Sequence, residues 1–562
     1  MGIWDGHDSG AALIEDNKIV FAANEERFTR RKLEVKFPYN SIDAALRYAE
    51  IKPSDVEVVA FSTTEFTKTL ERIMPYSKEY YYMFRRRKML RPRLEGFRHA
   101  LKYSMTSIGV LPLCGTVSKS IVAGQLRELG FSNYKLISVD HHTAHSASAA
   151  FASGLSSALV VTLDGLGDGR SGSISTLENG ELTMNRAISA RNSLGIFYEQ
   201  VTNIVGMREL EDEGKVMAMA DYSYPFAFEH NRLSSFFEVR GSQIVARYGP
   251  LAQYDMLSRI AWSMPREQFA YMAQQLTENV LQTLFTNAID EYGIGNVSMA
   301  GGIFSNVKAN MKIKDIKKLK DWFIFPHMGD GGLAAGAAMY AGYELNGTTS
   351  YRFDDAYLGP EYSDGEIRDA LKKEKSLYFE QDNDKSAHAG DLISKNNYLF
   401  WFQGRMEFGP RALGNRSVLA NAGSEDVKEK LNIYVKQREW YQPFAPAMLE
   451  EDAKSLLENL KGSGKFMTMV YKVRESKKEV MRSVMHIDAT ARPQIVRNEN
   501  KAYSDVMKRV RKKNGYGVIL NTSFNIHGQP IVMTPQDAIK TMKKTNTRYM
   551  FLGDYFVENK KG

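Results

Sequence analysis

Apolar and polar positions alternate along the chain in blocks that predict a mixed α/β protein. Residues 2–28 hold two apolar runs on either side of a polar turn at Glu15 to Lys18, as in a β-hairpin. Residues 37–51 have helical spacing, with Asn40 or Ser41 as the candidate N-cap. Short apolar runs predict strands and longer periodic segments predict helices. The strands are expected at 56–63, 135–139, 158–163, 172–188, 296–302 and near 322, and the helices at 118–129, 142–153, 265–292 and before 345.

Two segments break this alternation. Residues 68–103 mix basic and aromatic side chains, including YYYMF and RRRKMLRPR. A helical insertion with a solvated basic face is the favoured interpretation, and a surface facing lipid, RNA or the acceptor of a reaction is the alternative. The polar spacer 346–353 is the best candidate for a domain boundary. We therefore expect one domain over 1–345 and a second α+β domain over 354–562.

Composition limits the class of protein. A chain of 562 residues is too long for one core, and 43% hydrophobic with 25% charged residues is typical of soluble proteins. No apolar run approaches the ~20 residues of a membrane span, and the first residues do not resemble a signal peptide, so a cytoplasmic location is expected. The single cysteine, Cys114, excludes an internal disulfide and a cysteine-based metal site. The net charge of +8 suits ATP, but also RNA or anionic lipid.

A histidine pair in VDHHTAHSASAA is the strongest candidate for a metal site. His141 and His145 are four residues apart, which places two imidazoles on one helix face. Asp164 ends the apolar run 158–163, and Asp330 lies in a glycine-rich turn. Two histidines and two aspartates suit Fe(II), Mn(II) or Zn(II), and the sequence does not decide among them. Solvent-facing or buried structural histidines are the alternative interpretation.

Glycine-rich turns near these residues suggest contacts with a substrate or nucleotide. Small residues after His7 allow a ligand to approach the backbone, and MAGGIFSN has the glycines and asparagine of a ribose or phosphate site. A tight structural turn is the alternative in each case. The candidate contacts are Asp8, Asp168, Gly301, Gly302 and Asn306.

The second half of the chain is rich in arginine where glycine is also frequent. FQGRMEFGPRALGNRS carries three arginines within twelve residues, and arginine is the preferred fork for phosphate. A solvated charged segment would alternate in sign and contain fewer glycines. Three later motifs add further polar residues, so we expect one pocket for an anion. Its candidate residues are Arg405, Arg411, Arg416, Lys436, Arg438, Arg492 and Asn521.

These motifs together resemble a known family. HDSGAAL, EERFTRRK, VDHHTAHSASAAF, LDGLGDG, AGGIFSN, GRMEFGPRALGNRS, REWYQPFAP, TARPQ and NTSFN occur in the order found in the NodU/CmcH family of ATP-dependent O-carbamoyltransferases. The resemblance extends from end to end. It implies an N-terminal domain with the actin-like ATPase fold, which is a duplicated ribonuclease-H-like fold, and a C-terminal YrdC-like α+β domain.

The resemblance also implies a reaction. Carbamoyl phosphate and ATP would form carbamoyl-adenylate in the C-terminal domain, with Mg²⁺ accompanying ATP. The carbamoyl group would then pass to the hydroxyl of a small molecule, with a sugar or glycoside expected, at a metal favoured to be iron. His7 would be the general base, and Lys32 would contact the carbamoyl-adenylate. The opening GIWDGHDSG departs from the usual aromatic-His-Asp-Ser-Ala, so Gly6 and Gly10 are expected to leave more room for the acceptor.

Three other functions are less consistent with the motifs. A threonylcarbamoyl-type tRNA modification enzyme would not need the arginine-rich second half. An actin-like kinase or ATPase leaves the histidine pair unexplained, and a non-catalytic nucleotide-binding regulator leaves the whole set of site residues unexplained. The expected partners are ATP, carbamoyl phosphate and a small-molecule acceptor, with no nucleic acid. The resemblance suggests a homodimer, and residues 68–103 hint at an amphiphilic acceptor or a membrane surface.

Overall fold

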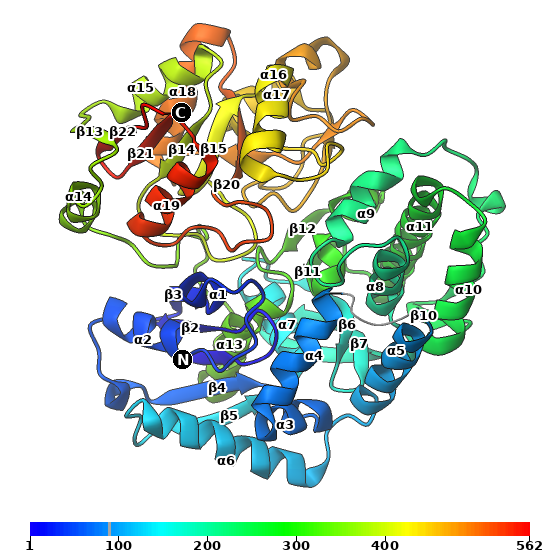
Figure 1. Ribbon diagram of the computed structural model, residues 1–562. Helices are drawn as coiled ribbons and strands as arrows, with labels where there is room; N and C mark the ends of the chain where they lie inside the picture. The colour runs from blue at the N-terminus through cyan, green and yellow to red at the C-terminus, as the bar shows by residue number, and fades with distance from the viewer. Residues whose placement is uncertain (88–91, 562) are drawn as a thin grey trace. The chain divides into compact units, whose positions relative to one another are not determined.

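The computed structural model describes residues 1–87 and 92–561 and has the expected mixed α/β fold. The chain divides into two compact units (Figure 1). The first comprises Met1–Glu25 and Leu33–Phe353, and the second comprises Glu26–Lys32 and Asp354–Gly562. The assignment of the short segment Glu26–Lys32 to the second unit has no counterpart in the sequence pattern.

The first unit contains two five-stranded sheets with the same topology. In each sheet the first three strands form an antiparallel meander, and two later strands add in parallel beside the first strand. One sheet has the order β3 (Lys18–Asn24), β2 (Gly10–Glu15), β1 (Gly2–Trp4), β4 (Val58–Ser62), β5 (Lys135–Val139). The other has the order β8 (Glu181–Ser189), β7 (Arg170–Glu178), β6 (Ala158–Gly167), β11 (Asn296–Ala300), β12 (Asp321–Ile324). The duplication is one of topology, with inserted segments of different length, so the sequence has no repeat of fixed period.

Two helices at the centre of this unit pack against each other. Helix α13 (Leu333–Asn346) covers β1, β2 and β4, and α7 (His141–Phe151) covers β6 and β11 (Figure 1). Their backbones approach closely, because a Cβ at Gly336 would lie 2.0 Å from the carbonyl oxygen of Ala144. The small residues of α13 are therefore required by packing between a sheet and a second helix.

The predicted hairpin is confirmed as β2 and β3, with Asp16 and Asn17 both at positive φ in its turn. Helix α2 (Tyr39–Tyr48) is also confirmed, but the predicted N-cap is wrong. Asn40 and Ser41 lie inside the first turn, and their backbone N–H groups donate to the Glu25 carboxylate at 3.1 and 2.9 Å. A carboxylate from a preceding segment thus caps the helix.

The remaining predicted strands and helices of this unit are present within a few residues of their expected ends. Of the helices, α6 (Pro112–Glu128) and α11 (Arg266–Tyr292) were predicted. The sequence pattern did not predict α8 (Leu194–Ile204), α9 (Glu213–Met219), α10 (Pro250–Trp262) or α12 (Val307–Lys314). Within the described residues, no helix combines the length and the apolar character needed to span a membrane.

The insertion at 68–103 is helical, as predicted, but several of its described basic residues are buried and not solvated. It forms α3 (Phe66–Ile73), α4 (Pro75–Arg87) and most of α5 (Pro92–Thr106). Lys68, Arg72 and Lys78 are each at most 8% exposed. Arg72 donates to both oxygens of the Asp5 carboxylate at 2.8 and 2.9 Å. The buried Asp5 thus stabilises basic side chains in the interior. The side chains of the RRRKMLRPR run lie outside the described residues.

The second unit is built on an eight-stranded mixed sheet. Helices α15 (Lys385–Ser394) and α18 (Lys501–Asn514) pack together over it and enclose a core that includes Trp401, Tyr503 and Phe551. The strand order is β13 (Tyr378–Gln381), β22 (Tyr555–Glu558), β21 (Tyr549–Leu552), β14 (Leu399–Phe402), β15 (Arg416–Asn421), β20 (Val518–Ser523), β16 (Ala445–Leu449), β19 (Gln494–Val496). The glycine- and arginine-rich motif is the loop that joins β14 to β15.

The segment Glu26–Lys32, which includes α1 (Glu26–Thr29), is fixed in the second unit by arginine side chains. Arg27 donates to the carbonyl oxygen of Gly409 at 2.9 Å. Arg30 donates to the carbonyl oxygens of Ile531 and Pro530 at 2.7 and 2.8 Å. Each guanidinium thus binds backbone carbonyls that would otherwise need another donor.

Candidate active site

The structure brings the two histidines and two aspartates into one cluster in the first unit. The Nε2 atoms of His141 and His145 lie 3.3 and 3.2 Å from Oδ2 of Asp164. Both Nε2 atoms are 3.7 Å from Oδ1 of Asp330. One potential ligand atom from each residue lies within 4.8 Å of all the others. Two imidazoles and two carboxylates at this spacing fit a divalent first-row transition metal.

Local structure explains how each ligand is positioned. Helix α7 begins at His141, so one helical turn separates the two imidazoles. The pairing of β6 with β7 slips between Leu163 and Gly167, and a bulge of this kind redirects the side chain of Asp164. Oδ1 of Asp164 accepts from the N–H of Gly302 at 3.2 Å, which leaves Oδ2 for the histidines.

The charges in the cluster are those of a cation site. Burial and then the negative charge of Asp164 raise the pKa of Asp330 well above its usual range. Burial opposes ionisation of Asp164, yet hydrogen bonds with the two histidines hold its pKa well below the usual range. Burial likewise lowers the pKa of His141, but Asp330 and Asp164 outweigh it and raise the pKa overall. A divalent cation would allow both carboxylates to be ionised and both imidazoles to be neutral.

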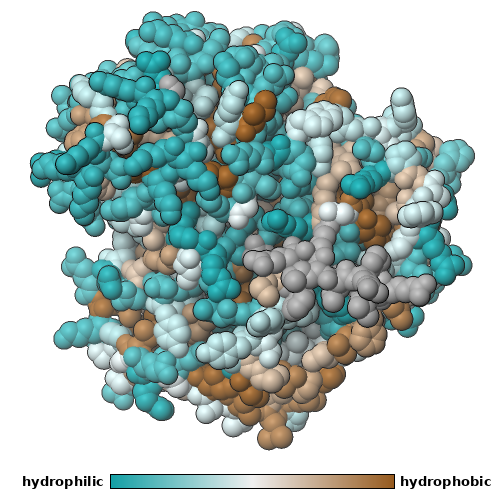
Figure 2. All heavy atoms as spheres, in the orientation of Figure 1, coloured by the Kyte–Doolittle hydropathy of each residue, from teal (hydrophilic) through white to brown (hydrophobic). Residues whose placement is uncertain are grey.

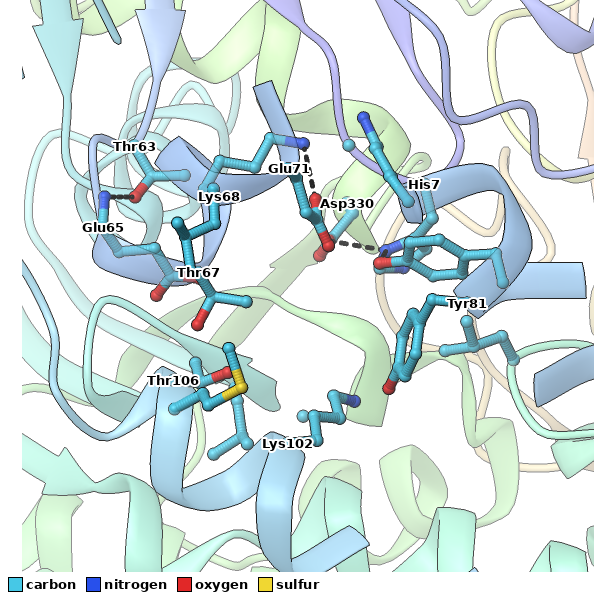
Figure 3. A pocket seen from close by; sticks show the side chains of 18 of the residues that line it. His7, Thr63, Glu65, Thr67, Lys68, Glu71, Tyr81, Lys102, Thr106 and Asp330 are labelled. Carbon is cyan, nitrogen blue, oxygen red and sulfur yellow. Dashed lines mark hydrogen bonds and ion pairs between the residues drawn. The ribbon is translucent and has the colours of Figure 1, made fainter. Parts of the chain in front are cut away.

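His7 stands beside this cluster at the wall of a cavity. Its Nδ1 is 3.5 Å from Oδ2 of Asp330 and 3.4 Å from the hydroxyl of Tyr82. The cavity has a volume of about 530 Å³, and His7, His141, Asp164 and Asp330 all contribute to its lining. Figure 3 shows His7 and Asp330 linked, with Lys102 and Thr106 of α5 across the cavity. The volume is in the range of small-molecule sites.

The expected extra room at Gly6 and Gly10 is absent. A Cβ at Gly6 would lie 1.9 Å from the Trp4 ring, and one at Gly10 would lie 2.6 Å from the carbonyl oxygen of Ala23. The missing side chains are replaced by the indole of Trp4 and by the neighbouring strand. These two glycines permit close packing and add no space to the acceptor side.

Asp8 and Asp168 have partners within the protein. Oδ2 of Asp8 is 3.6 Å from Nε2 of His327. Asp168 accepts from the backbone N–H of His141 at 2.7 Å and from the hydroxyl of Thr63. Asp168 therefore holds the start of the helix that carries the metal ligands.

The MAGGIFSN turn is adjacent to the metal cluster, but its asparagine has other contacts. Gly301 has φ of 109°, and a Cβ there would lie 2.1 Å from the carbonyl oxygen of Leu163. Asn306 accepts from the N–H of Ala309 at 3.1 Å, so it caps α12, and it pairs with Gln274 at 2.8 Å. Gly302 alone of these three candidates contacts a metal-ligand side chain, that of Asp164.

In the second unit, the structure gathers five of the predicted cations around one region. Burial lowers the pKa of Arg411, and burial with the charges of Arg411 and Arg438 lowers the pKa of Arg492 well below its usual range. Burial followed by Arg438 and Lys32 lowers the pKa of Lys436 in the same way. Loss of solvent is the main cause of these shifts, and repulsion between the positive charges adds to it at Arg492 and Lys436. An anion of several charges is the ligand that would relieve this repulsion.

Lys436 also donates to Ser523 and Asn525, and Arg438 donates to Asn432. Three other predicted residues of this unit make contacts with the protein as well. The Arg416 guanidinium is fully buried and donates to the carbonyl oxygens of Gln403, Gly404 and Asn415 at 2.6 to 3.1 Å. Arg405 donates to the carbonyl oxygen of Leu358 at 2.6 Å. Oδ1 of Asn521 is buried without a hydrogen-bond partner. Of the three, Asn521 thus has an acceptor atom available to a ligand.

Several residues at the cavity were missed because their types looked ordinary in sequence. Asp5, Lys68 and Lys78 form a buried group, in which Lys68 donates to the carbonyl oxygen of Asp5 at 2.8 Å. Burial and the charge of Lys68 lower the pKa of Lys78 to about 7. Asp5 lies two residues before His7, and this proximity to a candidate base was the available signal. Glu65 follows β4 in the segment STTEF and also lines the cavity.

Glu65 is expected to make stability depend on pH. Burial and the charge of Asp168 raise its pKa from 4.5 to about 8. The Glu65 carboxyl binds its proton more tightly in the folded state than in the unfolded state. The contribution of Glu65 to the free energy of unfolding is therefore fully present below about pH 4.5 and is lost as the pH rises to about 8. The loss is on the order of 3–5 kcal/mol. Urea unfolding of the wild type and of Glu65→Gln at pH 5 and pH 8 measures it, and a wild-type fall no steeper than that of the variant would contradict the prediction.

The fold and site define a two-unit α/β protein with a histidine–aspartate cluster suited to a metal in one unit and a group of neighbouring cations in the other. Residues 1–339 match the model of the carbamoyltransferase N-terminus, and residues 390–559 match that of the carbamoyltransferase C-terminus. The chain belongs to the carbamoyltransferase family, which confirms the resemblance seen in its motifs.

Individual relatives are similar over nearly the whole chain. The nodulation protein NolNO of Sinorhizobium fredii is 32% identical over 99% of this chain and 79% of its own length. The 3'-hydroxymethylcephem-O-carbamoyltransferase of Streptomyces clavuligerus is 24% identical over 98% and 97%. Among solved structures, full-length HypF in its phosphate- and nucleotide-bound form is a weak match, 15% identical with a TM-score of 0.32 over 62% of this chain and 56% of HypF.

Proposed function

We propose that the protein is an O-carbamoyltransferase that uses ATP and carbamoyl phosphate to carbamoylate a hydroxyl of a small molecule. One observation carries the proposal: a member of this family holds two chemically different sites in one chain. The first unit has the His141, His145, Asp164, Asp330 cluster, and the second has the group of buried and half-buried cations. A reaction with an activation step and a transfer step needs both.

The architecture supports a division of labour between the units. The two sheets of identical topology in the first unit are the arrangement expected of a duplicated ribonuclease-H-like, actin-like ATPase fold. We assign carbamoyl transfer to this unit, over residues 1–345. We assign activation to a YrdC-like domain over residues 354–562, together with Glu26–Lys32, which supplies Lys32 beside Lys436.

Activation joins two polyanions, and the cations of the second unit suit this task. Carbamoyl phosphate, water and ATP yield carbamoyl-adenylate, phosphate and pyrophosphate. Arg411, Arg438 and Arg492 would neutralise the phosphate charges of ATP, whose Mg²⁺ offsets the remainder. The mixed anhydride with AMP makes the carbamoyl carbon a better electrophile, because AMP is a good leaving group.

Transfer requires a base, a positioned carbonyl and little water. The acceptor oxygen forms a bond to the carbamoyl carbon, the bond to AMP breaks, and His7 takes the hydroxyl proton. General-base catalysis of this kind contributes ~10²–10⁴-fold. A divalent metal held by the two histidines and two aspartates would supply Lewis-acid polarisation. Fe(II) is our first choice from the family resemblance, with Zn(II) and Mn(II) as alternatives.

The proposal is tested by incubating the full-length protein with ATP, with and without carbamoyl phosphate, and measuring AMP and pyrophosphate. We expect AMP and pyrophosphate to be released in equal amounts only when carbamoyl phosphate is present. Formation of ADP, or AMP release that does not depend on carbamoyl phosphate, would indicate a kinase or an ATPase instead.

A further inference from the structure

The cavity beside the metal cluster is apolar over much of its wall. His7, Asp164 and Asp330 give it a reactive polar region, whereas carbon atoms from the insertion helices and their ends form another part of the lining. The apolar lining residues of these helices include Leu70, Met74, Tyr81, Phe97, Leu101 and Met105. A site that enclosed only a hydroxylated sugar would instead need hydrogen-bonding groups over its whole wall.

The charged residues that do line this wall are paired with one another. Nζ of Lys68 is 3.3 Å from the Glu71 carboxylate, and Nζ of Lys102 is 3.5 Å from that of Glu199. Arg98 is 2.5 Å from the Glu209 carboxylate. Lys68, Arg98 and Lys102 therefore each have an acidic partner in the protein. Lys78, which also lines the cavity, donates to the backbone carbonyl oxygen of Asp5, and the charges of Glu71 and Asp5 act on it. This balance favours a neutral acceptor over a polyamine or a polyanion.

One apolar residue of the lining is held in an unfavourable backbone conformation. Leu210 has φ of 67°, in the left-handed region that leucine seldom adopts. Its N–H donates to the Glu213 carboxyl at 2.7 Å, which helps to hold this conformation. Strained residues that surrounding structure maintains are concentrated at ligand sites.

The apolar wall continues to the surface. Met74, Phe97 and Leu101 line the cavity and are also 48%, 61% and 49% exposed. Next to Met74 along the chain, Ile73 and Tyr76 are exposed too. Figure 2 shows apolar side chains gathered over α3 and the adjoining end of α6. An apolar group bound in the cavity could therefore extend toward the surface while remaining in contact with apolar side chains.

We propose that the acceptor is a neutral amphiphile. Its hydroxyl-bearing polar group lies at His7 and the metal cluster, and its apolar part lies against the wall formed by α3, α4 and α5. The acceptor hydroxyl becomes a carbamate ester, with release of AMP and of the proton taken by His7. This inference depends on the proposed function and specifies the class of its acceptor.

The test compares two neutral probes with the same polar group, n-octyl β-D-glucopyranoside and methyl β-D-glucopyranoside. Binding of each to the full-length protein is measured calorimetrically below the micelle concentration. We expect the octyl compound to bind at least about tenfold more tightly, because each buried methylene favours binding. Equal binding of the two, or no binding of either, would overturn the inference.

Substitutions that introduce a negative charge at the mouth of the cavity test whether octyl glucoside binds there. Leu101→Glu and Met74→Glu are exposed positions that need no core rearrangement, and we expect each to weaken octyl glucoside binding by about tenfold. Leu113→Glu is the matched control, since Leu113 is 79% exposed and does not line the cavity. If Leu113→Glu weakens binding as much as Leu101→Glu, the octyl chain binds a surface patch and the proposed pocket is wrong.

Formation of AMP separates this inference from the proposed function. The activation step is measured on the same preparations without any glucoside. Carbamoyl-phosphate-dependent AMP formation without octyl selectivity rejects the amphiphile alone. Octyl selectivity without that AMP formation rejects the carbamoyltransferase mechanism and, with it, the role given to the bound amphiphile.

Discussion

Replacing His141 and His145 together with alanine is expected to abolish carbamoyl transfer while carbamoyl-phosphate-dependent AMP formation persists. The two imidazoles supply half of the ligand atoms of the cluster, and the remaining carboxylates would hold a transition metal weakly. Losing Lewis-acid stabilisation worth several kcal/mol lowers the transfer rate by ~10³-fold or more. The cations proposed for activation belong to the other unit, so that step does not use these histidines.

Metal content, AMP release and carbamoylated product are measured on the same preparations. His230→Ala is the matched control, because His230 is exposed and outside the cluster. It should retain the metal and both activities. A double variant that keeps the wild-type metal content, or that transfers the carbamoyl group at the wild-type rate, would show that the cluster is not the metal site of the reaction.

Arg411→Ala and Arg416→Ala are expected to have opposite effects, although both arginines lie in one loop motif. Arg411 is half-buried near Arg492, and neither charge is balanced by an ion pair among the described residues. Its removal should lower carbamoyl-phosphate-dependent AMP formation by ~10²–10³-fold and leave stability unchanged or higher. Arg416 binds three carbonyl oxygens and stacks on Phe402. Its removal leaves those acceptors unsatisfied and should cost roughly 3–5 kcal/mol of stability.

Chemical denaturation and AMP release on both variants distinguish the two roles. Arg411→Lys is informative beside Arg411→Ala, since it keeps the charge but loses the fork that matches a phosphate. We expect it to restore part of the activity. Destabilisation by Arg411→Ala comparable with that of Arg416→Ala would mean that Arg411 is structural, and the anion pocket would have to be reassigned.

The sequence was most informative where geometry is local. The spacing of His141 and His145 fixes their relation on a helix whatever surrounds them, and the structure retains it. Asp164 lies in β6 and Asp330 follows β12, two strands of the same sheet, so their proximity could be anticipated although they are 166 positions apart. Strand ends and helix faces are properties of short segments.

The sequence was least informative where a side chain has a choice of partner. The residues around Arg416 in the sequence do not show whether its guanidinium binds a phosphate or donates to the carbonyl oxygens of residues 403 and 404, as it does in the structure. The basic residues of α3 were expected in solvent, yet Asp5 draws Lys68 and Arg72 inside. Asp5 is more than sixty residues away along the chain, so the pairing exists only once the fold is formed.

The placement of Glu26–Lys32 in the second unit has a consequence for biosynthesis. Arg27 leaves the ribosome 382 residues before Gly409, its partner, and Arg30 precedes Ile531 by 501. The two arginine side chains cannot form these hydrogen bonds until most of the polypeptide has been synthesised. The second unit therefore completes its structure only when translation is nearly finished. A fragment starting at residue 354 would lack Lys32 from the outset. Exchange of the second unit between relatives would therefore have to include the segment Glu26–Lys32.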